Sequence, residues 1–311
     1  MSNEASPTGD QIHLERQAGD TIVSATVTSI GAGLRVLRVG DTDIIQGFPE
    51  DAEVAYCAGQ ILIPWPNRVR DGKWTHEGEH FQLSLNEPEL NNAIHGFLLA
   101  LPHEVMASSP QSVLLHATIP SSEGYPWELS VVTEYILTDA GVAITHRITN
   151  ASATAAPVAV GSHPFPRIGG VATEDLVVTL DAQTRVVVDD RLNPTGKEAV
   201  AGTRFDLRQG QRVGDFDLDT AYGDITARAD GRRVLTATAP DGRAVEVWGD
   251  HNFVQAQVFN TDKFPTPDGP GWAVALEPTT APPNAFNSHQ DLHMVEPGQT
   301  WDVTWGIEYK A

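Results

Sequence analysis

Apolar residues recur at every second position through most of the chain, and this period of two is the strongest constraint on its fold. Such alternation is typical of strands with one buried face, and no window of about 12 residues shows the 3.6-residue stripe of an amphipathic helix. Turn-forming Gly, Pro, Asn and Asp separate the alternating runs. The clearest runs cover residues 21–30, 34–39, 112–119, 127–137, 141–150, 175–180, 184–189, 233–239, 244–248, 253–259, 272–276 and 301–309.

So many short strands predict an all-β protein with few short helices, built as a large antiparallel sandwich or barrel. The chain has 311 residues, and β architectures of this size commonly form one domain. No fixed-period repeat is present, which argues against a propeller or a solenoid. We expect residues 1–10 to be disordered, because they carry few apolar side chains to bury, and residues 11–311 to form a single domain.

The charge balance excludes several partners. The sequence contains 20 Lys and Arg residues and 41 Asp and Glu residues, so the net charge is −21. Nucleic acids and anionic membranes both require a basic face, and neither is expected as a partner. The N-terminus lacks the pattern of an export signal, and no apolar stretch is long enough to span a bilayer. We therefore expect a soluble cytoplasmic protein.

Metal and cofactor motifs are also missing from the sequence. A single cysteine, Cys57, excludes an intramolecular disulfide and every multi-cysteine metal motif. The run DFDLD at 215–219 lacks the Gly and Glu of a calcium-binding loop, and His289 and His293 lack the intervening Glu of a zinc protease. Nucleotide-binding and serine-hydrolase motifs do not occur. We expect no metal and no organic cofactor.

Two polar clusters lie in unusual surroundings in the first third of the chain. In ILIPWPNRVRDGKW at 61–74, an apolar run with two prolines ends on Asn67 and Arg68, which places an amide beside a guanidinium. His95 follows in LNNAIHGF, where Gly96 permits a close approach of a substrate or of another backbone segment. Each cluster also has a purely structural interpretation. Under that interpretation Arg68 serves only to hold a loop in place, and His95 is only a turn residue before a glycine.

Three further candidates lie in the second half. In VGSHPFPRIG at 160–169, Pro164 restricts His163 to an extended conformation, and an imidazole that titrates near pH ~6.5 suits a general acid. Glu277 ends the apolar run WAVAL and precedes Pro278. Carboxylates are rarely buried unpaired, so Glu277 either meets a partner or performs chemistry. Asp219 belongs to an acidic run, and such runs often form only a solvent-exposed face. His163 also has a structural alternative, as a buried histidine with no role in chemistry.

These segments, taken in order, resemble the aldose 1-epimerases, the galactose mutarotase-like proteins. The ordered series covers most of the chain: IPWPNRVRDGKW, FQLSLNE, NNAIHG, SHPFPRI, LNPTGKEAVAGTRFDLR, LDTAY, LEPTTAPPNAFN and EPGQTWDVTW. Each motif is weak alone, and the series is specific. The resemblance implies the family's large antiparallel β-sandwich, the galactose mutarotase-like supersandwich, with the sugar in a cleft along one sheet.

The resemblance also implies roles for particular residues. His163 matches the general acid of the family and Glu277 matches the general base. The positions that match the groups holding the sugar hydroxyls are Asn67, Arg68, His95, Asp219 and Gln257, with Gln255 a weaker match than Gln257. The sequence departs from the usual motifs of the family at two places, Pro283-Asn284-Ala285 and Ser162-His163-Pro164-Phe165. These departures bear on the choice of sugar.

The function implied is interconversion of the α and β anomers of a free aldose such as galactose or glucose. Glu277 as carboxylate and His163 as imidazolium would move the two protons that ring opening requires, and we expect both to start charged. A tryptophan such as Trp65 could stack on the sugar. The alternatives are a hexose-6-phosphate 1-epimerase and a non-catalytic sugar-binding or sensing module. A monosaccharide is the expected partner, bound by a monomer or a homodimer.

Overall fold

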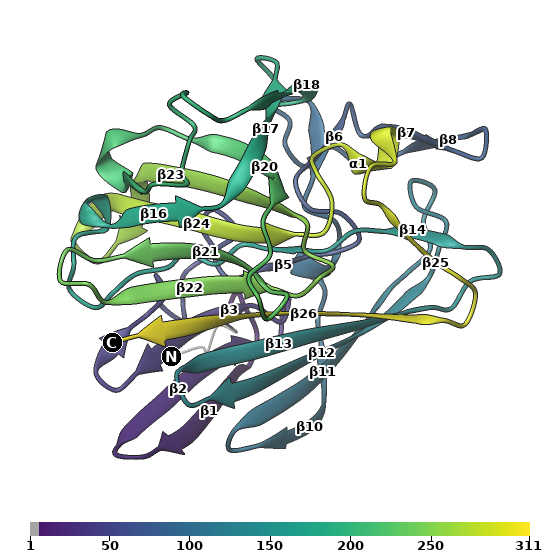
Figure 1. Ribbon diagram of the computed structural model, residues 1–311. Helices are drawn as coiled ribbons and strands as arrows, with labels where there is room; N and C mark the ends of the chain where they lie inside the picture. Colours follow the sequence, from purple (N-terminus) through teal and green to yellow (C-terminus); the bar gives the residue numbers. More distant parts are fainter. Residues whose placement is uncertain (1–5) are drawn as a thin grey trace.

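A computed structural model describes residues 6–311, and its strands form three larger antiparallel sheets and three two-stranded ribbons (Figure 1). Within this part of the chain the helical elements are one four-residue helix and three 3₁₀ turns, so the expected all-β fold with few short helices is confirmed. These are α1 (Ala285–Ser288), η1 (Leu98–Ala100), η2 (Thr173–Asp175) and η3 (Val213–Asp215).

The strands group by sheet as follows. The nine-stranded sheet contains, in spatial order, β10 (Glu104–Ser109), β11 (Ser112–Ile119), β12 (Leu129–Thr138), β13 (Gly141–Asn150), β26 (Thr300–Lys310), β22 (Ala244–Gly249), β21 (Arg233–Thr238), β16 (Val177–Leu180) and β19 (Gln211–Arg212). The seven-stranded sheet contains β18 (Pro194–Ala199), β17 (Ala182–Val188), β20 (Asp219–Ile225), β23 (Gln255–Thr266), β24 (Gly269–Thr279), β15 (Gly161–Ser162) and β5 (Ile61–Leu62).

The remaining strands are shorter or lie at the N-terminus. The four-stranded sheet contains β1 (Gln11–Ala18), β2 (Thr21–Thr28), β3 (Leu34–Val39) and β4 (Thr42–Asp43). The ribbons pair β6 (Arg68–Arg70) with β9 (Asn92–Ile94), β7 (Lys73–His76) with β8 (Glu79–Gln82), and β14 (Ala156–Val158) with β25 (His293–Val295).

The nine-stranded sheet is the layer that the other two large sheets share. Strands β1, β2 and β3 contact β11, β12 and β13 near one end of it, whereas β24 of the seven-stranded sheet contacts β21 and β22 toward the other end. The expected sandwich is therefore confirmed, and one extended apolar cluster draws side chains from all three sheets. The ribbon of β7 and β8 lies beside α1 and β6 at the edge of this assembly (Figure 1).

All twelve alternating runs correspond to strands of the structure. The alternation predicts them because β12 and β13 bury every second side chain on the shared core face. Strand β24 differs, since both of its faces are buried from Ala273 to Thr279. Its apolar run therefore carries Glu277 into the interior, where only 2% of that residue is exposed.

The N-terminal segment that we expected to be disordered falls partly outside the described residues, which begin at Ser6. Residues 6–10 form a turn in which the Gly9 N–H donates to Ser6 O at 2.9 Å. The Ile30 N–H donates to the carbonyl of the buried Thr8 at 3.0 Å, which ties the turn to the end of β2. No helix in residues 6–311 has the length and apolar character needed to cross a membrane.

A buried histidine in the nine-stranded sheet predicts a pH-dependent stability. The Trp305 indole N–H donates to His146 Nε2 at 3.0 Å, so the ring proton lies on Nδ1 and faces Thr133 Oγ1 at 3.1 Å. Burial, with a smaller contribution from His103, lowers the pKa of His146 to about 3. The unfolded chain binds this proton below pH ~6.5 and the folded chain does not, so stability falls as the pH is lowered through this range.

We expect the free energy of unfolding to lose ~1.4 kcal/mol per pH unit through this one residue. Chemical denaturation at pH 7 and pH 5 measures the loss in the wild type and in His146→Leu, which cannot titrate. The wild type is expected to lose roughly 2 kcal/mol more than the variant over this interval. Equal losses in the two proteins would show that His146 does not titrate as burial requires.

Candidate active site

A single pocket contains all seven of the residues predicted for the site. Its volume is about 270 Å³, close to the lower end of the ~300–1,000 Å³ range for small-molecule sites. The predicted residues come from chain segments up to 210 positions apart, and the pocket brings together Asn67, Arg68, His95, His163, Asp219, Gln257 and Glu277. Segments that are distant in the sequence therefore line one pocket.

The seven-stranded sheet supplies three of these side chains on one face. Gln257 of β23 lies directly opposite Glu277 of β24, and Asp219 of β20 lies opposite Phe259 of β23. Because residues two apart in a strand share a face, Gln257 and Phe259 point the same way. Gln257 donates a hydrogen bond from Nε2 to Asp219 Oδ1, which joins the two neighbouring strands across the floor of the pocket.

His163 follows β15 and faces Glu277. Its backbone N–H donates to Gln60 O at 3.0 Å, and the Gly59 N–H donates to His163 O at 2.9 Å, so the residue is held on both sides. The imidazole stacks on Phe165 with ring centroids 5.1 Å apart. His163 Nε2 lies 3.4 Å from Glu277 Oε1, and both side chains are less than a tenth exposed.

Burial determines the protonation of this pair. It lowers the pKa of His163 to about 4, and it raises the pKa of Glu277 well above its usual range, with a smaller contribution from the charge of Asp219. Both shifts act in the direction of a neutral imidazole beside a protonated carboxyl. This direction runs against our expectation that both groups start charged, because desolvation disfavours both charges. The two forms differ only in the position of one proton.

Asn67 and His95 hold each other in place. Both adopt left-handed backbone conformations, with φ of 57° and 65°, and the His95 N–H donates to Asn67 O at 3.0 Å. The Asn67 N–H donates to His95 Nδ1 at 3.1 Å, so a neutral His95 carries its proton on Nε2. Burial, with a contribution from His163, lowers the pKa of His95 well below its usual range and keeps it neutral. Its Nε2–H is a donor for a ligand.

Gly96 explains why the His-Gly step occurs at this point. A Cβ on Gly96 would lie 2.2 Å from Ile63 O, and its φ is 73°. Only glycine permits this approach, which brings the His95 segment against the apolar run at residues 61–63. Of the two approaches that Gly96 was expected to allow, the structure has the one by another backbone segment.

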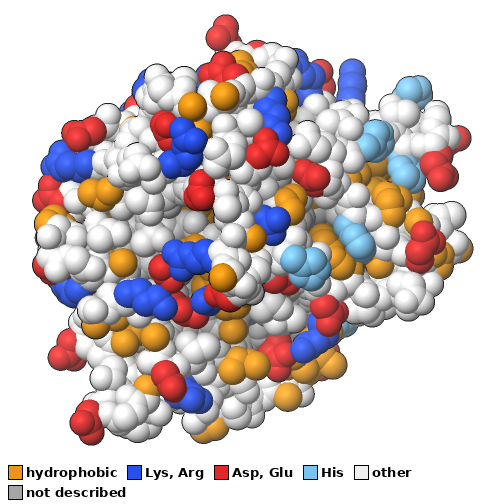
Figure 2. Space-filling model, in the orientation of Figure 1, with side chains coloured by type: hydrophobic (Ala, Val, Ile, Leu, Met, Phe, Trp, Pro, Cys, Tyr) orange, Lys and Arg blue, Asp and Glu red, His pale blue; other side chains and the backbone are white. Residues whose placement is uncertain are grey.

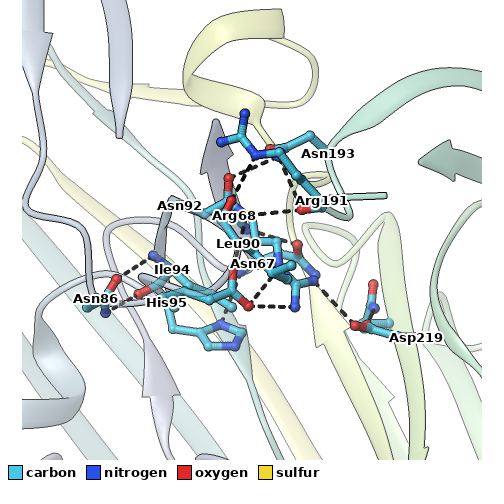
Figure 3. Close-up of polar contacts among 12 residues, drawn as sticks. Asn67, Arg68, Asn86, Leu90, Asn92, Ile94, His95, Arg191, Asn193 and Asp219 are labelled. Carbon is cyan, nitrogen blue, oxygen red and sulfur yellow. Dashed lines mark hydrogen bonds and ion pairs between the residues drawn. The ribbon is translucent and has the colours of Figure 1, made fainter. Parts of the chain in front are cut away.

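Arg68 lies between two carboxylates at the edge of the pocket (Figure 3). Its Nε and Nη2 bond the Glu87 carboxylate at 2.8–3.0 Å, and its Nη1 lies 3.4 Å from Asp219 Oδ2. Burial alone disfavours the guanidinium, but its hydrogen bonds to Glu87 and the charge of Asp219 outweigh this effect and raise the pKa of Arg68. Arg68 is therefore a fixed cation.

A buried amide pair connects Glu87 to a distant loop. Asn92 Nδ2 donates to Glu87 Oε2 at 2.9 Å, and Asn193 Nδ2 donates to Asn92 Oδ1 at 2.9 Å. Asn92 and Asn193 are both fully buried. Arg191, in the same loop as Asn193, donates from Nε to Leu90 O at 2.9 Å (Figure 3). The loop before β18 thus holds the segment that orients Arg68.

Seven pocket residues were not found from the sequence: Tyr56, Cys57, Asn86, Glu87, Glu89, Ile94 and Phe259. The motif FQLSLNE contains Glu87 but does not indicate that its partner is Arg68. Tyr56 and Phe259 provide the aromatic surface, with ring centroids 5.8 Å apart. Burial raises the pKa of Cys57 to about 12, so its thiol stays protonated and is a poor nucleophile.

The structure corrects the expectation for Trp65 and places Gln255 and Gln257 in different pockets. Trp65 is 3% exposed and packs on Phe97 and Phe286 in the core, so it does not present a face to this pocket. Gln257 lines the pocket, whereas Gln255 bonds Asp291 at 2.7 Å and lines a neighbouring pocket. Within residues 6–311, no three His, Cys, Asp or Glu side chains are grouped so that they could hold a metal ion.

Replacement of Glu87 by Gln is expected to raise the KM for a sugar ligand about tenfold and to change kcat less than about threefold. The variant loses the bidentate partner of a buried guanidinium, and loss of a contact to non-reacting groups of a ligand acts mainly on KM. Steady-state kinetics measures KM and kcat separately for Glu87→Gln and for a control variant, Glu89→Gln.

Glu89 is the matched control, since it is an exposed carboxylate at the rim of the same pocket. Among the described residues it forms no ion pair of 4.0 Å or less. If the two variants behave alike, the loss of negative charge and not the orientation of Arg68 determines the effect.

Comparison with known proteins identifies relatives along the whole chain. The sequence profile of the family described as aldose 1-epimerase matches residues 13–308. The uncharacterised protein YihR of Escherichia coli is 31% identical over 293 residues, covering 93% of this chain and 91% of YihR. Human galactose mutarotase is 28% identical, covering 83% of this chain and 80% of the human protein.

Solved structures agree in fold. A GalM/aldose epimerase homologue from C. elegans superposes with a TM-score of 0.83 at 20% identity, covering 97% of this chain and 99% of that chain. A putative aldose 1-epimerase from Escherichia coli has a TM-score of 0.80 at 16% identity, covering 97% and 99%. At these identities the likeness concerns the fold, and the expected supersandwich is confirmed.

Proposed function

The chain belongs to the aldose 1-epimerase family and is an isomerase, and on this premise we propose that it interconverts the α and β anomers of a free aldose such as galactose or glucose. His163 is the general acid and Glu277 the general base. The observation that carries the proposal is the 3.4 Å separation of His163 Nε2 and Glu277 Oε1 in a pocket with five further polar groups for a sugar.

The reaction follows from the chemistry of a cyclic hemiacetal, whose anomeric carbon inverts only after the ring opens. Glu277 as carboxylate takes the proton of the anomeric hydroxyl, the bond between the anomeric carbon and the ring oxygen breaks, and His163 as imidazolium gives a proton to the ring oxygen. The open aldehyde rotates about its first carbon–carbon bond and closes with the roles reversed. Positioned acid and base groups contribute typically ~10²–10⁴-fold.

Both protons that ring opening moves are exchanged with the buried pair of His163 and Glu277. Ring opening starts from the charged form and leaves a protonated Glu277 beside a neutral His163, the form that burial favours. The charged form before opening requires stabilisation from the bound sugar, whose hydroxyls donate to the carboxylate and whose ring oxygen accepts from the imidazolium. Burial therefore favours the enzyme form that accompanies the open-chain intermediate.

The remaining groups hold the sugar while its ring is open. His95 donates from Nε2, Arg68 donates as a fixed cation, and Asn67, Asp219 and Gln257 complete a set of donors and acceptors for hydroxyls. Such restraint is needed because the open chain gains rotational freedom that slows productive closure. Tyr56 and Phe259 offer an aromatic surface to the apolar face of the ring.

Two alternatives are less well supported by the pocket. A hexose-6-phosphate requires cations for its phosphate, but Arg68, the one Lys or Arg among the residues that line the described pocket, already bonds two carboxylates. Glu87 and Glu89 add negative charge at the rim. A non-catalytic sugar-binding module has no need of a paired acid and base, and this pocket has both.

The test is anomer exchange of freshly dissolved galactose, glucose, arabinose and xylose, followed by polarimetry or magnetization-transfer NMR against the uncatalysed rate. Acceleration of at least one sugar, abolished in both His163→Asn and Glu277→Gln, is the expected result. Folded protein that accelerates none of the four contradicts the proposal and directs attention to sugar phosphates or to binding without turnover.

A further inference from the structure

Two buried asparagines lie beside the candidate active site, and the proposed reaction gives neither of them a role. Asn92 begins β9, and Asn193 belongs to the loop that joins β17 to β18. Both are fully buried, and neither is among the residues that line the described pocket. A buried amide requires hydrogen-bond partners, and the partners of this pair connect the loop to the carboxylate that holds Arg68.

The hydrogen bonds of the two amides fix their orientation. Asn193 Nδ2 donates to Asn92 Oδ1 at 2.9 Å and to Arg191 O at 3.2 Å. Asn92 Nδ2 donates to Glu87 Oε2 at 2.9 Å and to Arg191 O at 3.1 Å. A flip of either amide would place its oxygen against another acceptor. The pair therefore has one favourable arrangement, which links the position of the loop to the position of the Glu87 carboxylate.

Glu87 fixes the guanidinium of Arg68, whereas the Arg68 backbone is held by other groups. The Arg68 N–H donates to Asn67 Oδ1 at 2.8 Å, and the Asn284 N–H donates to Arg68 O at 2.7 Å. The guanidinium makes a bidentate contact with Glu87 at 2.8–3.0 Å and a longer one with Asp219 at 3.4 Å. Because an arginine side chain has many rotamers, the bidentate contact determines where its free N–H groups point.

The main chain around Glu87 belongs to a small unit that needs outside support. The Glu87 N–H donates to Asn92 O at 3.2 Å, and the Asn92 N–H donates to Glu87 O at 3.1 Å. The Asn86 side chain bonds both main-chain groups of Ile94, at 2.7 and 2.9 Å (Figure 3). These contacts join Glu87 to the ribbon of β6 and β9, whose strands have three residues each. An isolated two-stranded ribbon is only marginally stable.

The loop between β17 and β18 supplies that support in two ways. At the surface, Arg70 pairs with Asp189 at 2.8 Å and Arg191 pairs with Asp71 at 2.7 Å. Basic and acidic side chains lie next to one another over β17 and β18, at the top of the view in Figure 2. Exposed ion pairs contribute little, whereas the loss of one partner of a buried hydrogen bond leaves an unpaired polar atom. The buried amide pair is therefore the stronger of the two links.

We propose that Asn92 and Asn193 are positioning residues for Arg68, which act through Glu87 and set the affinity of the pocket for a sugar. The inference rests on the proposed anomer exchange. It adds that a loop outside the pocket controls sugar affinity through a buried chain of hydrogen bonds. Because neither amide touches the reacting atoms, their loss acts on KM and leaves kcat nearly unchanged.

The test compares Asn193→Ala with a matched variant, Asn150→Ala. Asn150 is also a fully buried asparagine, and its Nδ2 also donates twice, to Thr154 O at 2.7 Å and to Val295 O at 2.8 Å. It ends β13 and does not line the pocket. Asp190→Ala, at an exposed position of the same loop as Asn193, is the control for a change at the loop surface. Steady-state anomer exchange of galactose and glucose gives KM and kcat, and calorimetry gives the Kd of each sugar.

We expect Asn193→Ala to raise KM and Kd about fivefold and to change kcat less than about twofold. In Asn150→Ala and Asp190→Ala, KM, Kd and kcat are expected to stay within about twofold of the wild type, although Asn150→Ala loses stability. Asn193→Ser, which keeps a hydroxyl at this position, is expected to raise KM about threefold and replaces Asn193→Ala if that variant does not fold.

A double variant tests whether Asn193 acts through Glu87. Glu87→Gln alone is expected to raise KM about tenfold, and the addition of Asn193→Ala is expected to raise it less than about twofold further, because the link to Arg68 is already weakened. Independent effects would instead multiply to about fiftyfold. A merely structural role of Asn193 predicts this product, so the double variant distinguishes the two.

Three results would overturn the inference: an unchanged KM in folded Asn193→Ala or Asn193→Ser, an equal rise of KM in Asn150→Ala, and independent effects in the double variant. A wild type that accelerates no sugar refutes the proposed function, and the Kd values then test the positioning role alone, with the same fivefold rise expected in Asn193→Ala. A wild type that neither accelerates nor binds any of the sugars contradicts both.

Discussion

Glu277→Gln is expected to lower kcat for anomer exchange by ~10²–10⁴-fold, the contribution typical of a positioned acid or base. The amide has nearly the same shape as the carboxyl but cannot take the proton of the anomeric hydroxyl. Because burial already favours the uncharged side chain, the variant also avoids the cost of a buried charge, so we expect its unfolding midpoint to equal or exceed that of the wild type.

Binding separates this result from a loss of structure. The affinity of Glu277→Gln for the sugar, measured by calorimetry, is expected to stay within about tenfold of the wild type, since the six other predicted residues of the pocket remain. Glu89→Gln, at the rim of the same pocket, is expected to keep full activity. Undiminished exchange in folded Glu277→Gln would refute its assignment as the base.

His163→Asn is expected to lower kcat by a similar ~10²–10⁴-fold, and His163 also sets the acid limit of the pH profile. Burial lowers the pKa of His163 to about 4, below the usual ~6.5. Between pH 7 and 5 His163 therefore stays neutral, and kcat/KM is expected to stay flat. Near pH 4 a second proton binds, Glu277 can no longer act as a base, and the activity falls.

The pH profile of kcat/KM measures this limit, which belongs to the pair and not to His163 alone. An acid limb near pH 6.5 would show that His163 titrates as a solvated histidine, contrary to its burial. In His163→Asn the residual activity is expected to lack this acid limb. Circular dichroism at each pH separates loss of activity from acid unfolding, to which His146 contributes.

The twelve clearest runs predicted strands that the structure contains, whereas β1, β10, β18 and β20 and the short elements around the site were not among those runs. Strands such as β12 and β13 are recognisable in the sequence because their side chains alternate between a buried and a solvated face. Strands β5, β6, β9 and β15 contain only two or three residues each, too few to show a period. These short strands place Arg68, His95 and His163.

The candidate site shows the same division. The seven predicted residues that line the pocket lie in motifs that are distinctive in the sequence, and the ordered series of motifs pointed to them together. Glu87 was missed because its role depends on a bidentate contact with Arg68. Trp65 was misjudged because its Pro-rich surroundings resemble a binding loop, although its ring packs on Phe97 and Phe286.

By itself the sequence determined most of the strand content and the acidic net charge, because these depend on residue type and on local periodicity, and the resemblance carried by its ordered motifs implied the acid and base candidates. Only the tertiary structure decided that Gln257 and not Gln255 lines the pocket of His163 and Glu277, and that burial lowers the pKa of His163 and raises that of Glu277. Both outcomes depend on strand register and on the depth of burial. Those quantities arise from contacts between segments more than 100 residues apart, such as His163 with Glu277, and residue order alone does not specify them.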